Sequence, residues 1–212
     1  MPHARFERLE PDRRERLLVA AAREFSLVGF EPASLGRIAE QAGFSKPGLY
    51  YYFEDKADLY ATVVRAAWER LSPQRRLEPE SLSRDDFWPA LAAFHLASYE
   101  GSLREPWLLA AWKLAYHPPR EPAASGAVTE VFATARAFLK AFLRRGQEMG
   151  VVRTDLPEEL LIALLTGVDN AADHWLVDHW EAIGPEEIAR LSRCVFDAMR
   201  TLVSPQASER GA

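Results

Sequence analysis

The stretch Ser45-Lys46-Pro47-Gly48-Leu49-Tyr50-Tyr51-Tyr52-Phe53 places a helix cap, a helix-starting proline and three adjacent tyrosines within nine residues. The Ser45 side chain is expected to cap the first amides of a short helix, and the fixed φ of Pro47 suits the start of that helix. Because successive helical residues are about 100° apart, Leu49 and Phe53 share one face and Tyr51 lies opposite. The sequence therefore predicts a short helix that buries Leu49 and Phe53 and presents tyrosine outward.

A second short helix is predicted directly before this stretch. Ser34 is placed to cap it, and Gly43 is placed to take the left-handed conformation that commonly ends a helix. The apolar residues between them recur at helical spacing and are Leu35, Ile38, Ala39 and Ala42. Only Phe44 and Ser45 separate the two helices, which is the spacing of a helix-turn-helix. In that motif the first helix buttresses the second, which lies in the DNA major groove with its N-terminal residues at the base edges.

Longer helices are predicted on both sides of this motif. An amphipathic helix from Asp12 to Val28 precedes it and stops at Gly29. A following helix is capped by Asp55, spans residues 55–71 and connects the motif to the rest of the chain. The apolar positions expected to face the core are Leu18, Ala22 and Phe25 in the first helix, and Leu59, Val63 and Ala66 in the second.

From about Arg13 to Val64 the chain resembles the DNA-binding domain of the TetR (AcrR-like) family of transcriptional regulators. The resemblance is carried by Phe25, Gly29-Phe30, Ile38 to Ser45, Leu49 to Phe53 and Lys56 to Leu59. Three residues depart from the family pattern, namely Ala33 for a frequent Thr or Ser, Gly36 for a longer side chain and Tyr52 for a frequent His. The resemblance implies a regulator that binds DNA as a dimer, most commonly a repressor that a small molecule releases from a palindromic operator.

The predicted DNA contacts lie on and beside the second short helix. Tyr51 is expected to meet a base edge or a thymine methyl, because it projects away from the core face. Lys46, Lys56 and Arg37 are expected to meet phosphates. The complete predicted set is Ser34, Arg37, Lys46, Pro47, Gly48, Tyr50, Tyr51, Tyr52 and Lys56.

The charge distribution excludes a non-specific polycation. The chain has 212 residues, 48% of them apolar, and a net charge of −5. Residues 1–56 contain nine Lys and Arg against nine Asp and Glu, so this part is neutral overall. Contacts with DNA must therefore depend on where single cations are placed, with Arg13 and Arg14 as further candidates.

Beyond residue 71 the pattern predicts only helices, so we expect an all-α fold of about nine helices. Predicted helices lie at Asp86 to Leu103, Pro106 to Tyr116, Val128 to Glu148, Glu158 to Glu181 and Glu186 to Val203. Polar connections that contain proline or glycine separate them, including one at Pro118 to Gly126. We predict a DNA-binding domain at residues 1–54, with the helix-turn-helix at about 34–53, and a ligand-binding and dimerisation domain at 55–212.

The last two predicted helices have broad apolar faces that need a partner. Packing within one chain accounts for them, and so does a second copy of the chain. The resemblance favours a two-fold interface of four helices, which would also bring two recognition helices to half-sites about 34 to 36 Å apart. The predicted interface residues are Leu164, Val168, Val195 and Met199.

The middle helices are rich in aromatic residues, which suit either a plain core or a small-molecule pocket. The resemblance favours a pocket for an effector, and its aromatic walls suggest an apolar or aromatic compound. The predicted ligand-binding residues are His95, Tyr99, Trp107, Trp112, Lys113, Asn170, His174 and Trp175. In this arrangement Trp175 faces the aromatic side chains of the middle helices.

Two other features are a candidate metal site and a single cysteine. Asn170, His174 and Asp178 share a helix face and have metal-ligand groups, but they equally suit a solvated face. Because the chain has no Cys-x-x-Cys and no His-Glu-x-x-His, we predict no metal and no cofactor. The single Cys194 lies among apolar residues and is expected to be a small buried side chain.

Two rival classes remain open at this stage. An enzyme would need a nucleophile motif or a phosphate-binding loop, and neither a G-x-S-x-G nor a Walker or dinucleotide fingerprint is present, so we predict no enzyme. A helical interaction module that has lost DNA binding is the other rival. The chain shows no signal peptide and no apolar run of membrane length, which leads us to expect a cytoplasmic protein without a membrane partner.

Overall fold

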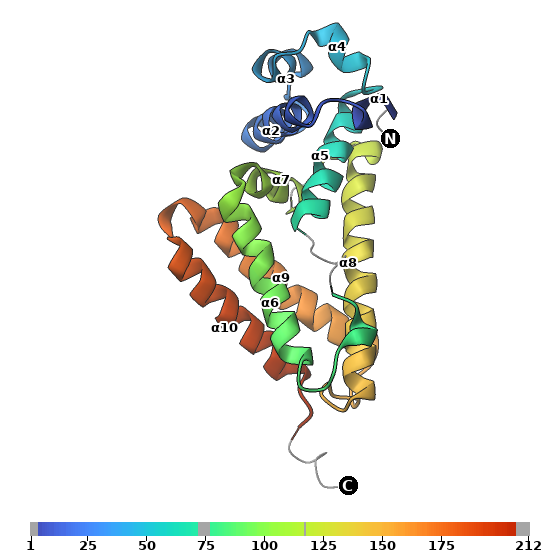
Figure 1. The fold of residues 1–212 in the computed structure, drawn as a ribbon, viewed down its shortest axis with the longest axis vertical. Helices are drawn as coiled ribbons and strands as arrows, with labels where there is room; N and C mark the ends of the chain where they lie inside the picture. Colours follow the sequence, from blue (N-terminus) through green and yellow to red (C-terminus); the bar gives the residue numbers. More distant parts are fainter. Residues whose placement is uncertain (1–3, 72–76, 117, 207–212) are drawn as a thin grey trace. The chain divides into compact units, whose positions relative to one another are not determined.

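The structure is a computed structural model that describes residues 4–71, 77–116 and 118–206. The described residues form ten α-helices and two short 3-10 helices (Figure 1), which confirms the all-α prediction. The α-helices are α1 (Ala4–Glu7), α2 (Pro11–Val28), α3 (Leu35–Ala42), α4 (Lys46–Tyr50), α5 (Lys56–Leu71), α6 (Phe87–Arg104), α7 (Pro106–Tyr116), α8 (Pro122–Glu148), α9 (Glu158–His179) and α10 (Pro185–Val203). The 3-10 helices are η2 (Pro79–Ser81) and η3 (Trp180–Ala182). The short α1 raises the number above the nine expected.

The chain divides into two compact units. The first unit contains Met1–Leu71 and Arg104–Phe132, and the second contains Ser72–Leu103 and Ala133–Ala212. The chain therefore passes between the units three times, and α8 begins in the first unit and ends in the second. The core of the first unit extends past residue 54, because α5, α7 and the start of α8 belong to it. The functional division at residues 54 and 55 remains a prediction.

Aromatic residues join α2 to α5 in the first unit. The Phe25 ring lies 5.2 Å from the Tyr60 ring, and Phe30 packs edge-on against Tyr60 at 5.4 Å between ring centres. The Tyr60 hydroxyl is buried and donates a hydrogen bond of 2.9 Å to the carbonyl of Leu114 in α7. Burial raises the pKa of the Tyr60 hydroxyl, so this group remains a neutral donor. Tyr60 thereby links the helix-turn-helix core to α7.

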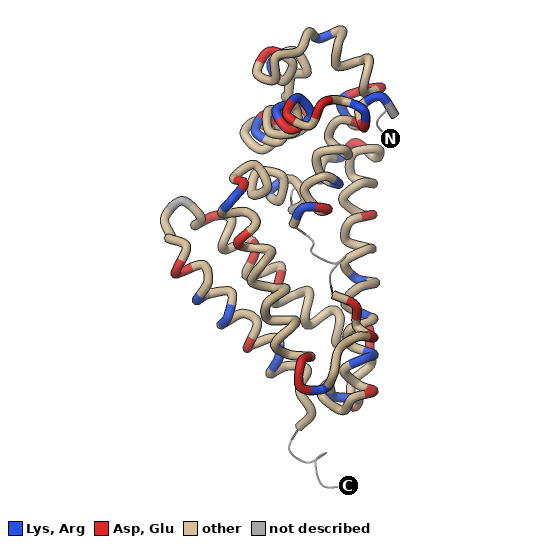
Figure 2. Tube along the Cα trace, viewed as in Figure 1, with Lys and Arg blue, Asp and Glu red and all other residues tan. Residues whose placement is uncertain are grey.

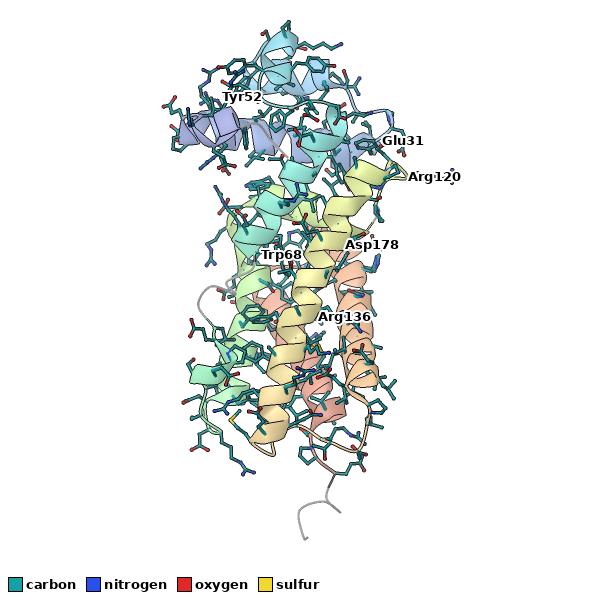
Figure 3. The ribbon with its side chains drawn as sticks, turned by 90° about the vertical axis from the view of Figure 1, so that its right-hand side faces the viewer. Glu31, Tyr52, Trp68, Arg120, Arg136 and Asp178 are labelled. Carbon is teal, nitrogen blue, oxygen red and sulfur yellow. The ribbon has the colours of Figure 1, made fainter. Side chains whose placement is uncertain are left out.

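The second unit packs α6, α9, α10 and the end of α8 around a core of its own. Phe87, Phe142, Leu161 and Ile162 are among its fully buried side chains. Gly146 of α8 permits the close approach of Val152 in the loop after that helix, because an added Cβ would lie 2.3 Å from a methyl carbon of Val152. In Figure 3, Arg136 marks α8, and its guanidinium forms an ion pair with Glu159 at the start of α9.

Two predictions about local structure, the start of α8 and the burial of Cys194, are wrong, and the end of α9 differs slightly from the approximate prediction. α8 begins at Pro122 and not at Val128, because proline suits the first turn and the following Ala-rich residues favour helix. α9 ends at His179, two residues earlier than predicted, and η3 follows it. Cys194 is exposed, because it lies on the side of α10 that faces away from the core of the second unit.

One described helix has the length and mean hydropathy of a membrane-spanning segment, namely α9. The core helix of a soluble protein passes the same test. Leu161 and Ile162 of α9 are fully buried in the second unit, and the carboxylate of Asp173 is buried as well. One face of α9 is therefore packed within the second unit.

Candidate nucleic-acid interface

Helix caps fix the two short helices of the predicted motif. The Ser34 hydroxyl accepts a hydrogen bond of 3.4 Å from the amide of Arg37, and the Ser45 hydroxyl accepts one of 3.1 Å from the amide of Gly48. Gly43 ends α3 with φ 73° and ψ 34°, the left-handed conformation that glycine adopts without a steric penalty. The amide of Phe44 then donates to the carbonyl of Ala39 at 2.8 Å. The predicted caps and the predicted stop are confirmed.

α4 and the turn that follows it have a buried and an exposed face. Leu49 and Phe53 retain only 1% and 2% of their accessible surface, whereas Tyr50 and Tyr51 are 49% and 52% exposed. Tyr52 is half-buried, and Figure 3 shows it among the side chains of the helix-turn-helix. The faces predicted from the sequence are therefore confirmed, and Tyr51 is available to a partner.

Three aromatic side chains form a continuous row, namely the half-buried Phe44 and Tyr52 and the exposed Tyr51. The Phe44 and Tyr52 rings meet edge to face at 6.1 Å between centres, and the Tyr52 and Tyr51 rings do so at 5.1 Å. Arginine lies at each end of this aromatic row. The guanidinium carbon of Arg13 lies 4.7 Å from the centre of the Phe44 ring, and that of Arg5 lies 4.5 Å from the centre of the Tyr51 ring.

The side chain of Arg37 is 52% exposed, but its guanidinium is bound to a residue of α2. Its Nε donates to the buried carboxylate of Glu24 at 2.9 Å, and that carboxylate also accepts a bond of 2.9 Å from the amide of Ser34. The Arg37 hydrogen bond holds the pKa of Glu24 below its ordinary value against the opposing effect of burial. Glu24 thus ties α2 to the start of α3, which gives Arg37 a structural role.

Lys56 has a similar role at the start of α5. Its ammonium donates to the carbonyl of Glu31 at 2.7 Å and to that of Ala33 at 3.3 Å, and it lies 4.7 Å from the centre of the Phe30 ring. These contacts fix the loop that leads into α3. The sequence pattern does not reveal this role, because both acceptors are backbone carbonyls more than 20 residues away.

Few charges lie on α4 itself. Figure 2 shows Lys and Arg interspersed with Asp and Glu along α2, whereas α4 carries Lys46 as its single charged residue. Lys46 and Pro47 are both exposed at the start of α4. The helix end that would meet base edges in a helix-turn-helix therefore presents a cation, a proline ring and tyrosine.

Two of the predicted effector residues lie in a polar network inside the second unit. His95 Nδ1 lies 2.9 Å from the hydroxyl of Ser192, and His95 Nε2 lies 3.3 Å from a carboxylate oxygen of Asp169. One helical turn along α6, the buried Tyr99 hydroxyl donates to Asp173 at 2.6 Å. Side chains of α6, α9 and α10 thus meet at one polar cluster.

The α9 residues chosen from the sequence are not the ones that join this cluster. Asn170, His174 and Trp175 are exposed, and Trp175 stacks on His179 at 4.1 Å between ring centres. The sequence predicts that Trp175 faces the aromatic side chains of the middle helices. Within the second unit this prediction is wrong, because Trp175 is exposed and stacks on His179 of its own helix. The residues of α9 that join the cluster are the half-buried Asp169 and the buried Asp173. Their spacing of four residues matches that of His95 and Tyr99, and this was the signal that could have revealed them.

The remaining effector candidates belong to the first unit. Trp107 is 7% exposed, and its indole N–H donates to the Glu105 carboxylate at 3.1 Å. Trp112 and Lys113 are half-buried in the same helix, α7. Two open surface hollows of about 490 and 730 Å³ lie at the two ends of α10, and charged and small residues line them rather than these aromatic residues.

The predicted dimer residues lie at the edge of the second core. Leu164, Val168, Val195 and Met199 are all half-buried, and Met199 packs against buried residues of that core. Beside them on α9, Leu160 and Trp175 are 44% and 46% exposed. Within the described residues, no three His, Cys, Asp or Glu side chains are grouped so as to hold a metal ion.

Known proteins resemble either the N-terminal part of the chain or most of its length. Residues 17–63 match the model of the family described as bacterial regulatory proteins, tetR family. The uncharacterized transcriptional regulator YdgC of Bacillus subtilis is 38% identical over 78 residues, which are 34% of this chain and 40% of YdgC. The repressor Rv1474c of Mycobacterium tuberculosis is 24% identical over 188 residues, which are 89% of this chain and 93% of Rv1474c. The first curated relatives are matched over only 25 to 40% of their own length.

Solved structures share the whole fold. SmeT, the repressor of the Stenotrophomonas maltophilia multidrug efflux pump SmeDEF, has a TM-score of 0.71 at 18% identity and is matched over 92% of this chain and 94% of SmeT. The complex of SmeT with triclosan has a TM-score of 0.73 at 17% identity and is matched over 93% of this chain and 94% of that chain. The family match to residues 17–63 and the capped, outward-facing helix α4 show that the chain carries the DNA-binding domain of the TetR family of transcriptional regulators, and the solved structures share its fold.

Proposed function

We propose that the chain represses transcription as a cytoplasmic homodimer on a palindromic operator and is released by a small apolar or aromatic effector. The observation that carries this proposal is α4, where Ser45 and buried Leu49 fix a short helix that presents Tyr51 outward. Lys46 and Pro47 stand exposed at the end of that helix which enters the groove in a helix-turn-helix.

The proposed DNA contacts follow from which side chains are available. Tyr51 meets a base edge or thymine methyl, and Lys46 meets a phosphate. Arg37 and Lys56 act through the fold, because Glu24 and the carbonyls of Glu31 and Ala33 hold them. The neutral charge of residues 1–56 favours specific contacts of this kind over general attraction to DNA.

A dimer is proposed because one helix-turn-helix reads only half of a palindromic site. Leu160 and Trp175 are large apolar side chains left exposed on α9, beside the half-buried Leu164 and Val168. A second copy of α9 and α10 would cover these side chains. Repression is favoured by the relatives Rv1474c and SmeT, both of which are named as repressors.

The effector is proposed to act through the polar cluster around His95 and Tyr99. Among the structural relatives, SmeT has been solved with triclosan. A compound bound in the second unit can change operator affinity only if it prefers one arrangement of the two units over another. The chain connects the two units at 71–72, 103–104 and 132–133. We propose that the backbone at these three connections moves when the effector binds.

Selection of bound sequences from random DNA tests this proposal. The wild-type chain should enrich one two-fold-symmetric sequence, and gel-shift with that sequence should show a discrimination of about 1 to 3 kcal/mol that Tyr51→Ala removes. Tyr60→Phe serves as the control, because it also removes a tyrosine hydroxyl from the first unit but from a buried position. If the wild-type chain enriches no sequence, the proposed function is wrong.

A further inference from the structure

The residues ahead of α2 are packed against the helix-turn-helix. The Phe6 side chain is 3% exposed, and its ring lies 5.0 Å from the Phe53 ring and 6.5 Å from the Tyr52 ring. The Leu9 amide donates to the Phe6 carbonyl at 3.0 Å, and Glu7 forms an ion pair of 3.7 Å with Arg14 of α2. Figure 1 shows α1 beside the end of α4. Residues 4–9 are thus a fixed part of the first unit, anchored by Phe6.

This anchor sets Arg5 against the residue proposed to read the bases. The guanidinium carbon of Arg5 lies 4.5 Å from the centre of the Tyr51 ring. A guanidinium that stacks on a ring keeps its five N–H donors pointing outward in its own plane, so they stay available to oxygen acceptors. Arg5 is exposed, and among the described residues the Tyr51 ring is its partner.

Arg5 differs in this respect from the cations chosen by sequence pattern. Arg37 is bound to Glu24, and Lys56 is bound to the carbonyls of Glu31 and Ala33. Arg5 and Arg13 instead flank the aromatic row of Phe44, Tyr52 and Tyr51 at its two ends. Cations placed beside aromatic groups suit a surface that meets phosphates and base edges together.

We infer that residues 4–9 are a third part of the DNA-binding surface, in which Arg5 binds a phosphate next to the base read by Tyr51. The stacked guanidinium also holds the Tyr51 ring in its outward position. This inference rests on the proposed function. It concerns a segment that lies outside residues 17–63, the part of the chain matched by the family model.

Operator binding by Arg5→Ala tests the inference, with the selected sequence as the probe. We expect affinity to fall about tenfold, because a hydrogen bond to a charged group contributes at least that factor. The slope of log affinity against log salt should fall by about one unit, as for one lost phosphate contact. Arg5→Lys should keep most of the slope and recover only part of the affinity, because lysine retains the charge but lacks the planar fork.

Two further variants separate this role from a general effect of charge or folding. Arg84→Ala removes the same charge from an exposed position in the second unit and should bind operator like the wild type. The loss in Arg5→Ala with Tyr51→Ala should be smaller than the sum of the single losses, because the two side chains share one contact. Thermal unfolding of Arg5→Ala should match the wild type, since Phe6 still anchors the segment.

The experiments distinguish a failure of the inference about residues 4–9 from a failure of the proposed function. If Tyr51→Ala loses the operator while Arg5→Ala binds it with wild-type affinity and an unchanged salt slope, the inference about residues 4–9 is wrong and the proposed function stands. Strictly additive losses in the double variant would also overturn it, because they would separate Arg5 from Tyr51. If the wild-type chain selects no DNA, the proposed function itself fails.

Discussion

At the scale of single residues, the cations of the first unit divide into those that hold the fold and those that face outward. Arg37 and Lys56 are bound to internal acceptors, whereas Lys46 and Arg5 are exposed around α4. Charge type and sequence position do not separate the two groups. The difference is whether a buried carboxylate or a backbone carbonyl lies within hydrogen-bond distance of the cation. The packing of α2, α3 and α5 determines where these acceptors lie.

Lys56→Ala should therefore lower stability more than it changes the electrostatics of DNA binding. Two carbonyl contacts in the loop before α3 are lost, so we expect the free energy of unfolding to fall by about 1 to 3 kcal/mol. The salt slope of operator binding should stay unchanged. Chemical denaturation and gel-shift at several salt concentrations measure the two quantities. A slope lower by one unit at wild-type stability would instead identify Lys56 as a phosphate ligand.

Glu24→Gln should destabilise the first unit in a manner that depends on pH. The pKa of Glu24 is lowered in the folded chain, so its carboxylate stabilises the fold above the pKa of the unfolded chain, and this contribution is lost as the pH falls through the folded value. Near pH 7 we expect a loss of about 1 to 3 kcal/mol, because the charged acceptor of Arg37 is removed. Below pH 4 the difference between wild type and variant should shrink. Denaturant unfolding across pH 3 to 7 tests this, and a constant difference would contradict it.

At the scale of elements, backbone conformation decides where the helices of the motif end. Gly43 has a positive φ of 73° between α3 and α4, and the amides of Gly43 and Phe44 close the end of α3. A residue with a Cβ adopts this conformation at a steric cost. The turn therefore depends on glycine, and with it the angle at which α4 leaves α3.

Gly43→Ala should lower the free energy of unfolding by about 1 to 2 kcal/mol, the cost of a left-handed conformation for a residue with a Cβ. Gly126→Ala is the matched control in the same unit. Gly126 lies inside α8 with open space around an added Cβ, so alanine should stabilise the helix by about 0.5 to 1 kcal/mol. Urea unfolding of both variants checks the pair. Equal effects would show that the turn tolerates a Cβ.

At the scale of the whole molecule, the proposed function depends on two units and on a second chain. The first unit contains the helix-turn-helix together with α5, α7 and the start of α8, so the proposed connecting helix is part of its core. The second unit contains the polar cluster and the exposed apolar residues of α9. A signal from the effector must therefore act between units and not within the helix-turn-helix.

Leu164→Glu should split the proposed dimer and abolish binding to a palindromic operator. Leu160→Glu should do the same with little effect on folding, because Leu160 is already 44% exposed in the single chain. Leu27→Glu is the control, since it places the same charge at a 76% exposed leucine of α2. Analytical ultracentrifugation at micromolar concentration reports the assembly. A wild-type chain that sediments as a monomer would refute the interface.

An effector that releases the operator should obey reciprocity. Operator DNA should weaken effector binding by the same factor by which the effector weakens operator binding, typically 5- to 150-fold for a coupling of about 1 to 3 kcal/mol. His95→Ala should raise the effector concentration needed for release and leave operator affinity without effector near that of the wild type. Tryptophan emission and gel-shift report the two equilibria. A compound that saturably quenches emission but leaves the gel-shift unchanged would show a pocket uncoupled from DNA.

The local signals in the sequence determined the helix-turn-helix and its faces. Ser34, Gly43 and Ser45 act on neighbours no more than five residues away, so their roles follow from spacing alone. The buried and exposed sides of α4 follow from helical periodicity in the same way. The start of α8 was missed because proline and alanine suit both a connection and a first helical turn.

Only the tertiary structure decided which polar side chains are already engaged. Glu24 meets Arg37, and Lys56 meets two carbonyls. Asp169 and Asp173 of α9 meet α6, whereas Asn170 and His174 are exposed. These partners are far apart in the chain, and a rotation of α9 by one residue, about 100°, exchanges its inward and outward groups. Helical spacing defines which residues share a face, whereas the packing of other helices determines which face is buried.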